Sequence, residues 1–229
     1  MEQNMKTAEE IAKTTNKALE LVLNFAKFIS KHVDGSLEQT MGMFEDKLKY
    51  MRWERQVRLM QKADEFRIKF CIKDEYKQIP MKLAIPFFEA STLEDDDYLQ
   101  DLWAKLLVNS TNPENDFNLT RSIISILEQM TSLDAIILEK IYENSYEEMF
   151  NKGVKTGYLP EYAPIQIKED DDDIKLNDIQ IKLALSNLSR IGCLKFCLTW
   201  SGEEHFDVVI PTLLGKTVYE ACTLKNYLV

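Results

Sequence analysis

The chain has little glycine or proline, with 7 and 6 of these residues in a length of 229. This excludes collagen-like and low-complexity proteins, and a hydrophobic share of 45% with 29% charged residues is typical of a helix-rich globular protein. The longest apolar runs are interrupted by lysines and acids before they reach the roughly 18 residues of a membrane-spanning helix. We therefore expect no transmembrane segment.

Recognisable catalytic and redox motifs are also missing. The four cysteines form no paired CxxC knuckles, and no secretory signal pattern opens the chain, so a reducing cytoplasm is the expected location. A phosphate-cradling GxxxxGK[ST] loop is absent. The only histidines, His32 and His205, lie in no known nucleophile context, and the chain is more simply interpreted as a binding protein than as an enzyme.

Charge is unevenly distributed along the sequence, although the net charge is −10. Lys and Arg outnumber the acids in residues 41–82, whereas acids predominate in residues 83–229. Only the first region would attract a polyanion.

The most informative stretch is residues 79–113, where the sequence predicts two helices and the corner between them. Pro80 suits the first turn of a helix, and Pro86 lies inside that helix. A second helix is indicated by an apolar stripe at helical spacing. Its members are Leu99, Leu102, Trp103, Leu106 and Leu107.

The corner between these helices carries the spacing of capping boxes. Ser91 stands three residues before Glu94, and Thr92 stands three residues before Asp95. We therefore expect these pairs to satisfy the first N–H groups of the second helix.

This stretch, IPMKLAIPFFEASTLEDDDYLQDLWAKLLVNSTNP, resembles the signature of the Abi-alpha family, bacterial abortive-infection proteins of phage defence. The likeness continues through residues 132–144, 184–194 and 212–222, and so covers most of residues 45–223. The resemblance implies a role in defence against phage, and it supplies no catalytic residues to carry over.

A long helix is predicted over residues 37–71, and its polar faces carry cations beside aromatic rings. This arrangement is a candidate surface for a protein partner or a phage product, and it would also suit single-stranded nucleic acid. A solvated helix face with internal ion pairs is the simpler alternative. The candidate contacts are Arg52, Trp53, Arg55, Arg58 and Lys62.

The C-terminal segment, residues 131–229, has the element order of a winged-helix module with one β-hairpin. An acidic insertion occupies residues 153–176, and the helix expected over 178–191 has only Lys182 and Arg190 as cations. Carboxylates facing phosphates oppose DNA binding, so these two residues are candidate nucleic-acid contacts in a module that favours a protein partner or a second copy of the chain.

Residues 1–36 contain an amphipathic helix with lysines opposite its apolar stripe. Such a helix packs on the body of the protein or on a second copy, and the alternative is peripheral contact with an anionic membrane surface.

We expect no metal and no cofactor. The carboxylates at Asp95, Asp96, Asp97 and Asp101 point around a helical turn, and the run 170–173 lacks the ligand spacing of a calcium loop. A second set of metal-ligating residue types matches no common zinc motif. It consists of Cys193, Cys197, His205 and Cys222.

These observations predict a mainly α protein with an N-terminal helix (1–36), a helical body (37–130) and a winged-helix-like module (131–229). Its expected function is phage defence by binding a macromolecule, with nucleic-acid regulation and membrane action as alternatives.

Overall fold

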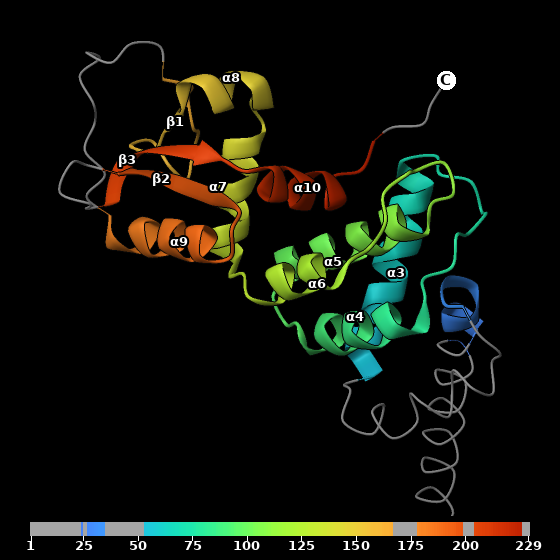
Figure 1. Cartoon of the computed structure of the whole chain (residues 1–229). Coiled ribbons are helices and arrows are strands. Elements are labelled where there is room, and N and C mark those ends of the chain that lie inside the picture. The colour runs from blue at the N-terminus through green and yellow to red at the C-terminus, as the bar shows by residue number, and fades with distance from the viewer. Residues whose placement is uncertain (1–23, 25–26, 35–52, 167–177, 199–203, 226–229) are drawn as a thin grey trace, which may run out of the picture. The chain divides into compact units, whose positions relative to one another are not determined.

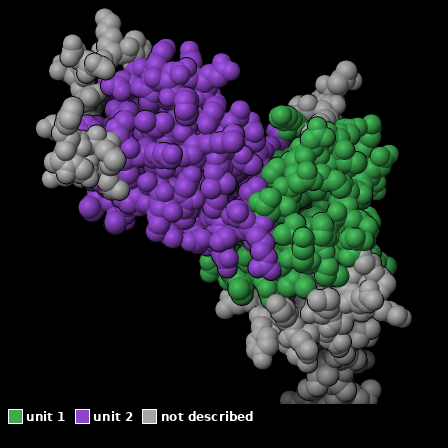
Figure 2. Space-filling model, viewed as in Figure 1, with its two compact units in different colours: residues 1–95, 103–120, 225–229 green, residues 96–102, 121–224 purple. Residues whose placement is uncertain are grey.

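The computed structural model describes residues 24, 27–34, 53–166, 178–198 and 204–225 (Figure 1). Contacts between residues divide the chain into two compact units (Figure 2), namely residues 1–95, 103–120 and 225–229 (unit 1) and residues 96–102 and 121–224 (unit 2). The mainly helical fold class is confirmed, with one small antiparallel sheet near the C-terminus. The division into segments 1–36, 37–130 and 131–229 stays a prediction.

Unit 1 is built around helices α3 (Trp53–Lys69), α4 (Met81–Leu93) and the larger part of α5 (Asp97–Thr111). Its core is aromatic, because the Phe87 ring meets Trp103 edge to face at 5.3 Å and Phe88 at 5.2 Å. Further apolar residues complete the core, and the predicted stripe of α5 around Trp103 is buried as expected. Those that are fully buried include Leu59, Ala84, Leu106 and Leu107.

The described part of the N-terminal amphipathic pattern packs into this core. Phe28, Ile29 and Val33 are buried, and Val33 forms a parallel bridge with Ile79. Two backbone bonds flank this bridge: the Ile79 N–H donates to the His32 carbonyl at 2.7 Å, and the Asp34 N–H donates to the Ile79 carbonyl at 2.9 Å. Phe28, Ile29, His32 and Val33 therefore face protein, and most of the remaining predicted helix lies outside the described residues.

The corner after α4 differs from the prediction. Ser91 and Thr92 are buried in the last turn of α4, and the Thr92 hydroxyl donates back to the Phe88 carbonyl at 2.5 Å. The group that caps α5 is Asp96, whose carboxylate accepts from the Leu99 N–H at 3.0 Å. The capping boxes at Ser91 and Thr92 were wrong because hydroxyls can equally bond to the preceding turn of their own helix.

Unit 2 contains the remaining elements, and its sheet has the strand order β1-β3-β2. Helix α9 buries its Leu185 side against the unit, and the β2–β3 hairpin follows as predicted. The short strand β1 pairs with β3 and was not indicated by the sequence. The element bounds are α6 Arg121–Glu128, α7 Ser132–Tyr142, α8 Tyr146–Lys152, β1 Val154–Lys155, α9 Ile179–Arg190, β2 Leu194–Leu198, β3 Glu204–Pro211 and α10 Leu213–Ala221.

Helix α10 is fastened to unit 2 at its first turn. Thr212 caps the helix by accepting from the Gly215 N–H, and the Tyr142 hydroxyl donates to the Cys193 carbonyl at 2.6 Å and accepts from the Thr212 N–H at 2.8 Å. A Cβ at Gly215 would overlap the Cys193 carbonyl and the Tyr142 hydroxyl, so only glycine permits this approach. Gly192 ends the α9 region at φ +81°, as expected for a helix C′ residue.

Candidate functional site

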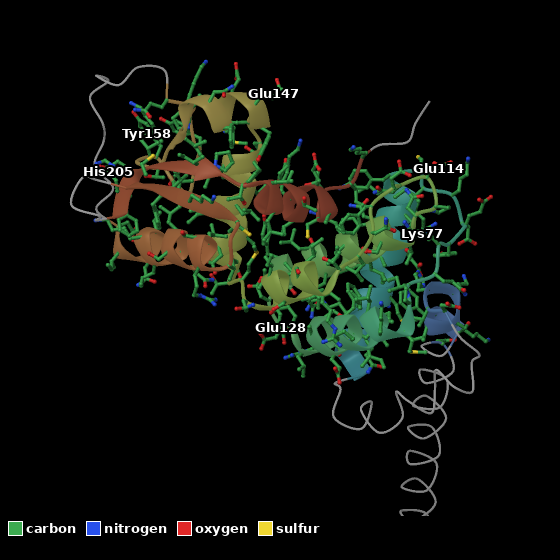
Figure 3. The ribbon with its side chains drawn as sticks, viewed as in Figure 1. Lys77, Glu114, Glu128, Glu147, Tyr158 and His205 are labelled. Atoms are coloured by element: carbon green, nitrogen blue, oxygen red, sulfur yellow. The ribbon has the colours of Figure 1, made fainter. Side chains whose placement is uncertain are left out.

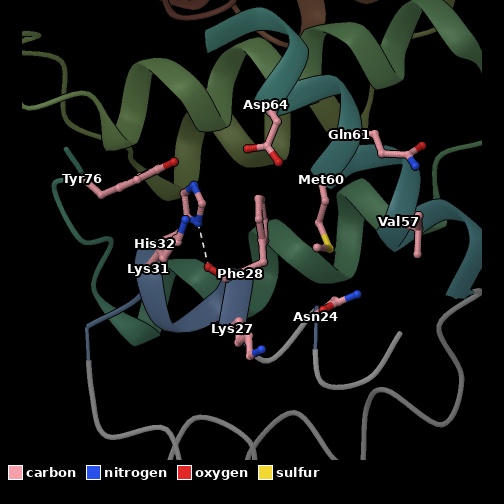
Figure 4. Close-up of a pocket in the computed structure, with 10 residues that line it drawn as sticks. All are labelled: Asn24, Lys27, Phe28, Lys31, His32, Val57, Met60, Gln61, Asp64 and Tyr76. Carbon is pink, nitrogen blue, oxygen red and sulfur yellow. Dashed lines mark hydrogen bonds between the residues drawn. The ribbon is translucent and has the colours of Figure 1, made fainter. Parts of the chain in front are cut away.

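Unit 1 contains a cleft of about 470 Å³ between residues 27–32, helix α3 and Tyr76 (Figure 4), and we call it the His32 cleft. Ligand pockets commonly have this size. The lining residues are Asn24, Lys27, Phe28, Lys31, His32, Val57, Met60, Gln61, Asp64 and Tyr76.

His32 lies at the inner wall of this cleft and is only 1% exposed. Its Nδ1 lies 2.7 Å from the Phe28 carbonyl oxygen, and because a carbonyl only accepts, Nδ1 carries the proton. Burial lowers the His32 pKa to about 4. The imidazole is therefore neutral near pH 7, and Nε2 is a hydrogen-bond acceptor.

Tyr76 covers His32 from the loop that follows α3. The two rings meet edge to face at 4.6 Å, and burial together with a hydrogen bond to Asp74 raises the Tyr76 pKa to about 12. The buried Arg67 guanidinium stacks on the other side of the Tyr76 ring, 4.1 Å from its centroid. Arg67 Nη2 also donates to the carbonyl oxygens of Lys73 and Glu75, which fixes the loop around Tyr76.

A second loop of unit 1 holds the Tyr76 loop in place. The Lys77 N–H donates to the Thr111 carbonyl at 2.7 Å, and its ammonium donates to the Phe117 carbonyl at 2.7 Å. Lys73 forms an ion pair with Glu114 at 2.5 Å, and Lys77 and Glu114 mark these two loops in Figure 3. The position of Tyr76 therefore depends on contacts far from it in sequence.

The cleft combines acceptors inside with cations at its edge. Asp64 projects from α3 toward His32 (Figure 4), and burial raises the pKa of its carboxyl. Lys27 and Lys31 are exposed one helical turn apart. No serine, threonine or cysteine lines the described cleft, so the arrangement suits binding better than nucleophilic catalysis.

A model of the family described as Abortive infection alpha matches residues 54–222. The chain belongs to this family. No curated protein and no solved structure matches the chain. The match confirms the resemblance drawn from residues 79–113, and it includes the α3 wall of the cleft but not the segment that carries His32.

The basic face predicted on α3 of this Abortive infection alpha chain is partly occupied by its own contacts. The Arg55 side chain is 17% exposed, donates to the Leu93 carbonyl and lies 3.3 Å from Asp95. Arg58 and Lys62 are half-buried and also take part in interactions. Arg52 lies outside the described residues, as does the side chain of Trp53, and the basic face stays a prediction.

The two candidate nucleic-acid contacts on α9 also have partners within unit 2. The Lys182 ammonium lies 5.8 Å from the centroid of the Phe206 ring. Arg190 donates to Asn187 Oδ1 at 2.7 Å and to Gln129 Oε1 at 3.0 Å. Their role in nucleic-acid contact stays a prediction.

The residues weighed for metal binding are separated by the fold. Cys197 and His205 face each other across the hairpin. Cys193 precedes the other end of strand β2, and Cys222 follows α10. Burial raises the pKa of the Cys193 thiol to about 12, which suits a core thiol. Within the described ranges no group of three or more His, Cys, Asp or Glu could hold a metal ion, and the acidic run 170–173 lies outside them.

His32 was named from the sequence only as a histidine outside any nucleophile context, and no sequence pattern predicted the cleft. A signal was present, because Phe28 and His32 stand one turn apart on the apolar face of the N-terminal pattern. Tyr76 had no such signal, since it lies in a loop whose position is set by bonds to residues 111–117.

Proposed function

We propose that this chain is a phage-defence protein that acts by binding a macromolecular partner or a phage product. Membership of the Abortive infection alpha family supports the defence role. In the described part of the chain no helix is both long and apolar enough to cross a membrane.

The observation that carries the binding proposal is the outer face of α9. Ile179 and Leu183 stand one turn apart on this helix, with 62% and 56% of their surfaces exposed. Covering apolar surface contributes roughly 25 cal/mol per Å², which a protein partner can supply and a phosphate backbone cannot. Since Lys182 and Arg190 already have contacts, this face favours a protein over nucleic acid.

The direct test replaces Ile179 and Leu183 together by glutamate in the full chain. Because both side chains are exposed, the variant is expected to fold as the wild type does by circular dichroism. We expect it to lose protection in plaque assays and to lose the partner that co-purifies with the wild type from infected cells. Leu213→Glu is the matched control, since Leu213 is 70% exposed on α10 and should remain functional. Full protection by the α9 variant would refute this surface.

The basic face of α3 offers a second place for the partner, and its test needs care. Arg55→Glu would also break contacts with Leu93 and Asp95, so loss of function there would be ambiguous. Charge reversal of Arg52 and Arg58 leaves the Arg55 contacts in place, and circular dichroism would check that this variant still folds. Unchanged protection and partner capture in that variant would remove the basic face.

The order α7, α8, β1, α9, β2, β3 favours a winged-helix-like module, and nucleic-acid binding is therefore the alternative function. It predicts a gel shift that weakens as salt rises, and it predicts that Lys182→Ala or Arg190→Ala reduces the shift. A shift that does not respond to these substitutions would exclude α9 as the contact.

A further inference from the structure

We propose that the His32 cleft binds a small organic anion that carries N–H donors on an apolar body. Nucleotides and amino acids share this chemistry. The inference goes beyond the macromolecular partner proposed above, because it rests on unit 1 alone and needs neither α9 nor the basic face of Arg55, Arg58 and Lys62.

The inner wall of the cleft requires a donor from the ligand. His32 Nδ1 is committed to the Phe28 carbonyl, and Nε2 has no hydrogen-bond partner among the described residues. In Figure 4 the free edge of the ring points to the space between Asp64 and Tyr76. A ligand N–H placed in that space would donate to this nitrogen.

Asp64 supplies a second acceptor close to the first. Its carboxylate is exposed and faces His32 from α3. A ligand amino group placed between Asp64 and Nε2 would satisfy both. Two acceptors side by side select for an amine, an amide or the exocyclic amino group of a base.

The cations around the cleft favour a negative charge on the ligand. Lys27 and Lys31 line it from one helical face, and the Lys31 ammonium lies 5.5 Å from the Tyr76 ring centroid. Arg67 does not line the cleft, but its guanidinium stacks 4.1 Å from the Tyr76 ring centroid and adds positive charge nearby. These groups favour a carboxylate or phosphate on the ligand.

The remaining wall is apolar. Phe28 stands in the middle of the cleft, and Val57 and Met60 face it from α3 (Figure 4). A volume of about 470 Å³ accepts a molecule of nucleotide size or smaller. A planar base or an apolar amino-acid side chain would fill this part of the space.

Calorimetric titration of the full chain with two sets of probes tests the inference. One set is AMP, GMP, CMP and UMP, and the other is leucine, phenylalanine and methionine. We expect at least one member of one set to bind with a dissociation constant below about 1 mM. Inorganic phosphate alone should not bind. The set that binds identifies the source of the ligand.

Variants then connect the binding to the cleft. His32→Phe keeps an aromatic ring and removes the acceptor, and we expect it to weaken binding about tenfold or more. Because a core variant can unfold, the exposed pair Lys27→Gln and Lys31→Gln provides a second test and should weaken binding similarly. Lys195→Gln is the matched control, since this exposed lysine lies on strand β2 of unit 2.

The outcomes are decisive in both directions. Binding that is lost in the cleft variants and kept in the control supports the site. The inference is overturned if neither set binds at probe concentrations up to about 5 mM. It is also overturned if the cleft variants bind the probe as the wild type does. The α9 variants of the preceding section leave this result unchanged, so the two proposals fail separately.

Discussion

Acidification should destabilise the protein through His32. The folded-state pKa of about 4 lies below the ordinary value of 6.5, so the unfolded chain binds the proton more readily. The free energy of unfolding therefore falls as pH drops from 6.5 to 4, and it changes little through this group outside that window. At about 1.36 kcal/mol per unit of pKa, the full effect is about 3 kcal/mol, and about 2 kcal/mol of it is reached at pH 5.

The assay is urea unfolding at pH 7 and pH 5 for the wild type and for His32→Phe. Carboxylates titrate in both proteins, and their contribution cancels when the two pH differences are compared. We expect the wild type to lose about 2 kcal/mol more than the variant between these pH values. Ile29→Val is the matched control, because it removes one buried methyl group and should cost about 1 kcal/mol at either pH.

Equal losses in the wild type and in His32→Phe would refute the reasoning. Such a result would mean that His32 gains a proton in the folded state as easily as in the unfolded chain.

Three further substitutions in unit 2 are checked by the same unfolding assay. Tyr142→Phe removes a hydroxyl that donates to the Cys193 carbonyl and accepts from a backbone N–H, and it should cost about 1–3 kcal/mol. Gly215→Ala should cost about 2 kcal/mol or more, and less when combined with Tyr142→Phe, because the removed hydroxyl is one of the two groups a Cβ would overlap. Thr131→Ala breaks the capping box of α7 and should cost about 1 kcal/mol, whereas Ser145→Ala should cost little, since the Ser145 side chain makes no cap bond to α8. Equal effects at Thr131 and Ser145 would contradict the capping account.

The sequence predicted the elements whose signals are local. The apolar stripe around Trp103 and the β-hairpin each depend on residues close together in the sequence, and the structure has both at or near the expected positions. Strand β1 spans two residues, too few to show an alternating pattern.

The cleft could not be predicted because its parts come together through long-range bonds. The Ile79 N–H meets the His32 carbonyl across 46 intervening residues of the chain. Arg67 appears in the sequence as one more cation on a basic helix, yet it is buried and stacked on Tyr76. Basic residues on one helix thus differ in exposure in ways that composition does not reveal.

The bridge between Val33 and Ile79 bears on how fragments of this protein should be prepared. A truncated chain that starts where the family model starts, at residue 54, would lack Phe28, Ile29 and Val33. The Phe88 ring, which meets Phe28 at 6.5 Å, would then be uncovered on that side, as would Ile79. Such a fragment should aggregate more readily than the whole chain, and expression trials bounded by the family alignment would underestimate the stability of the natural protein.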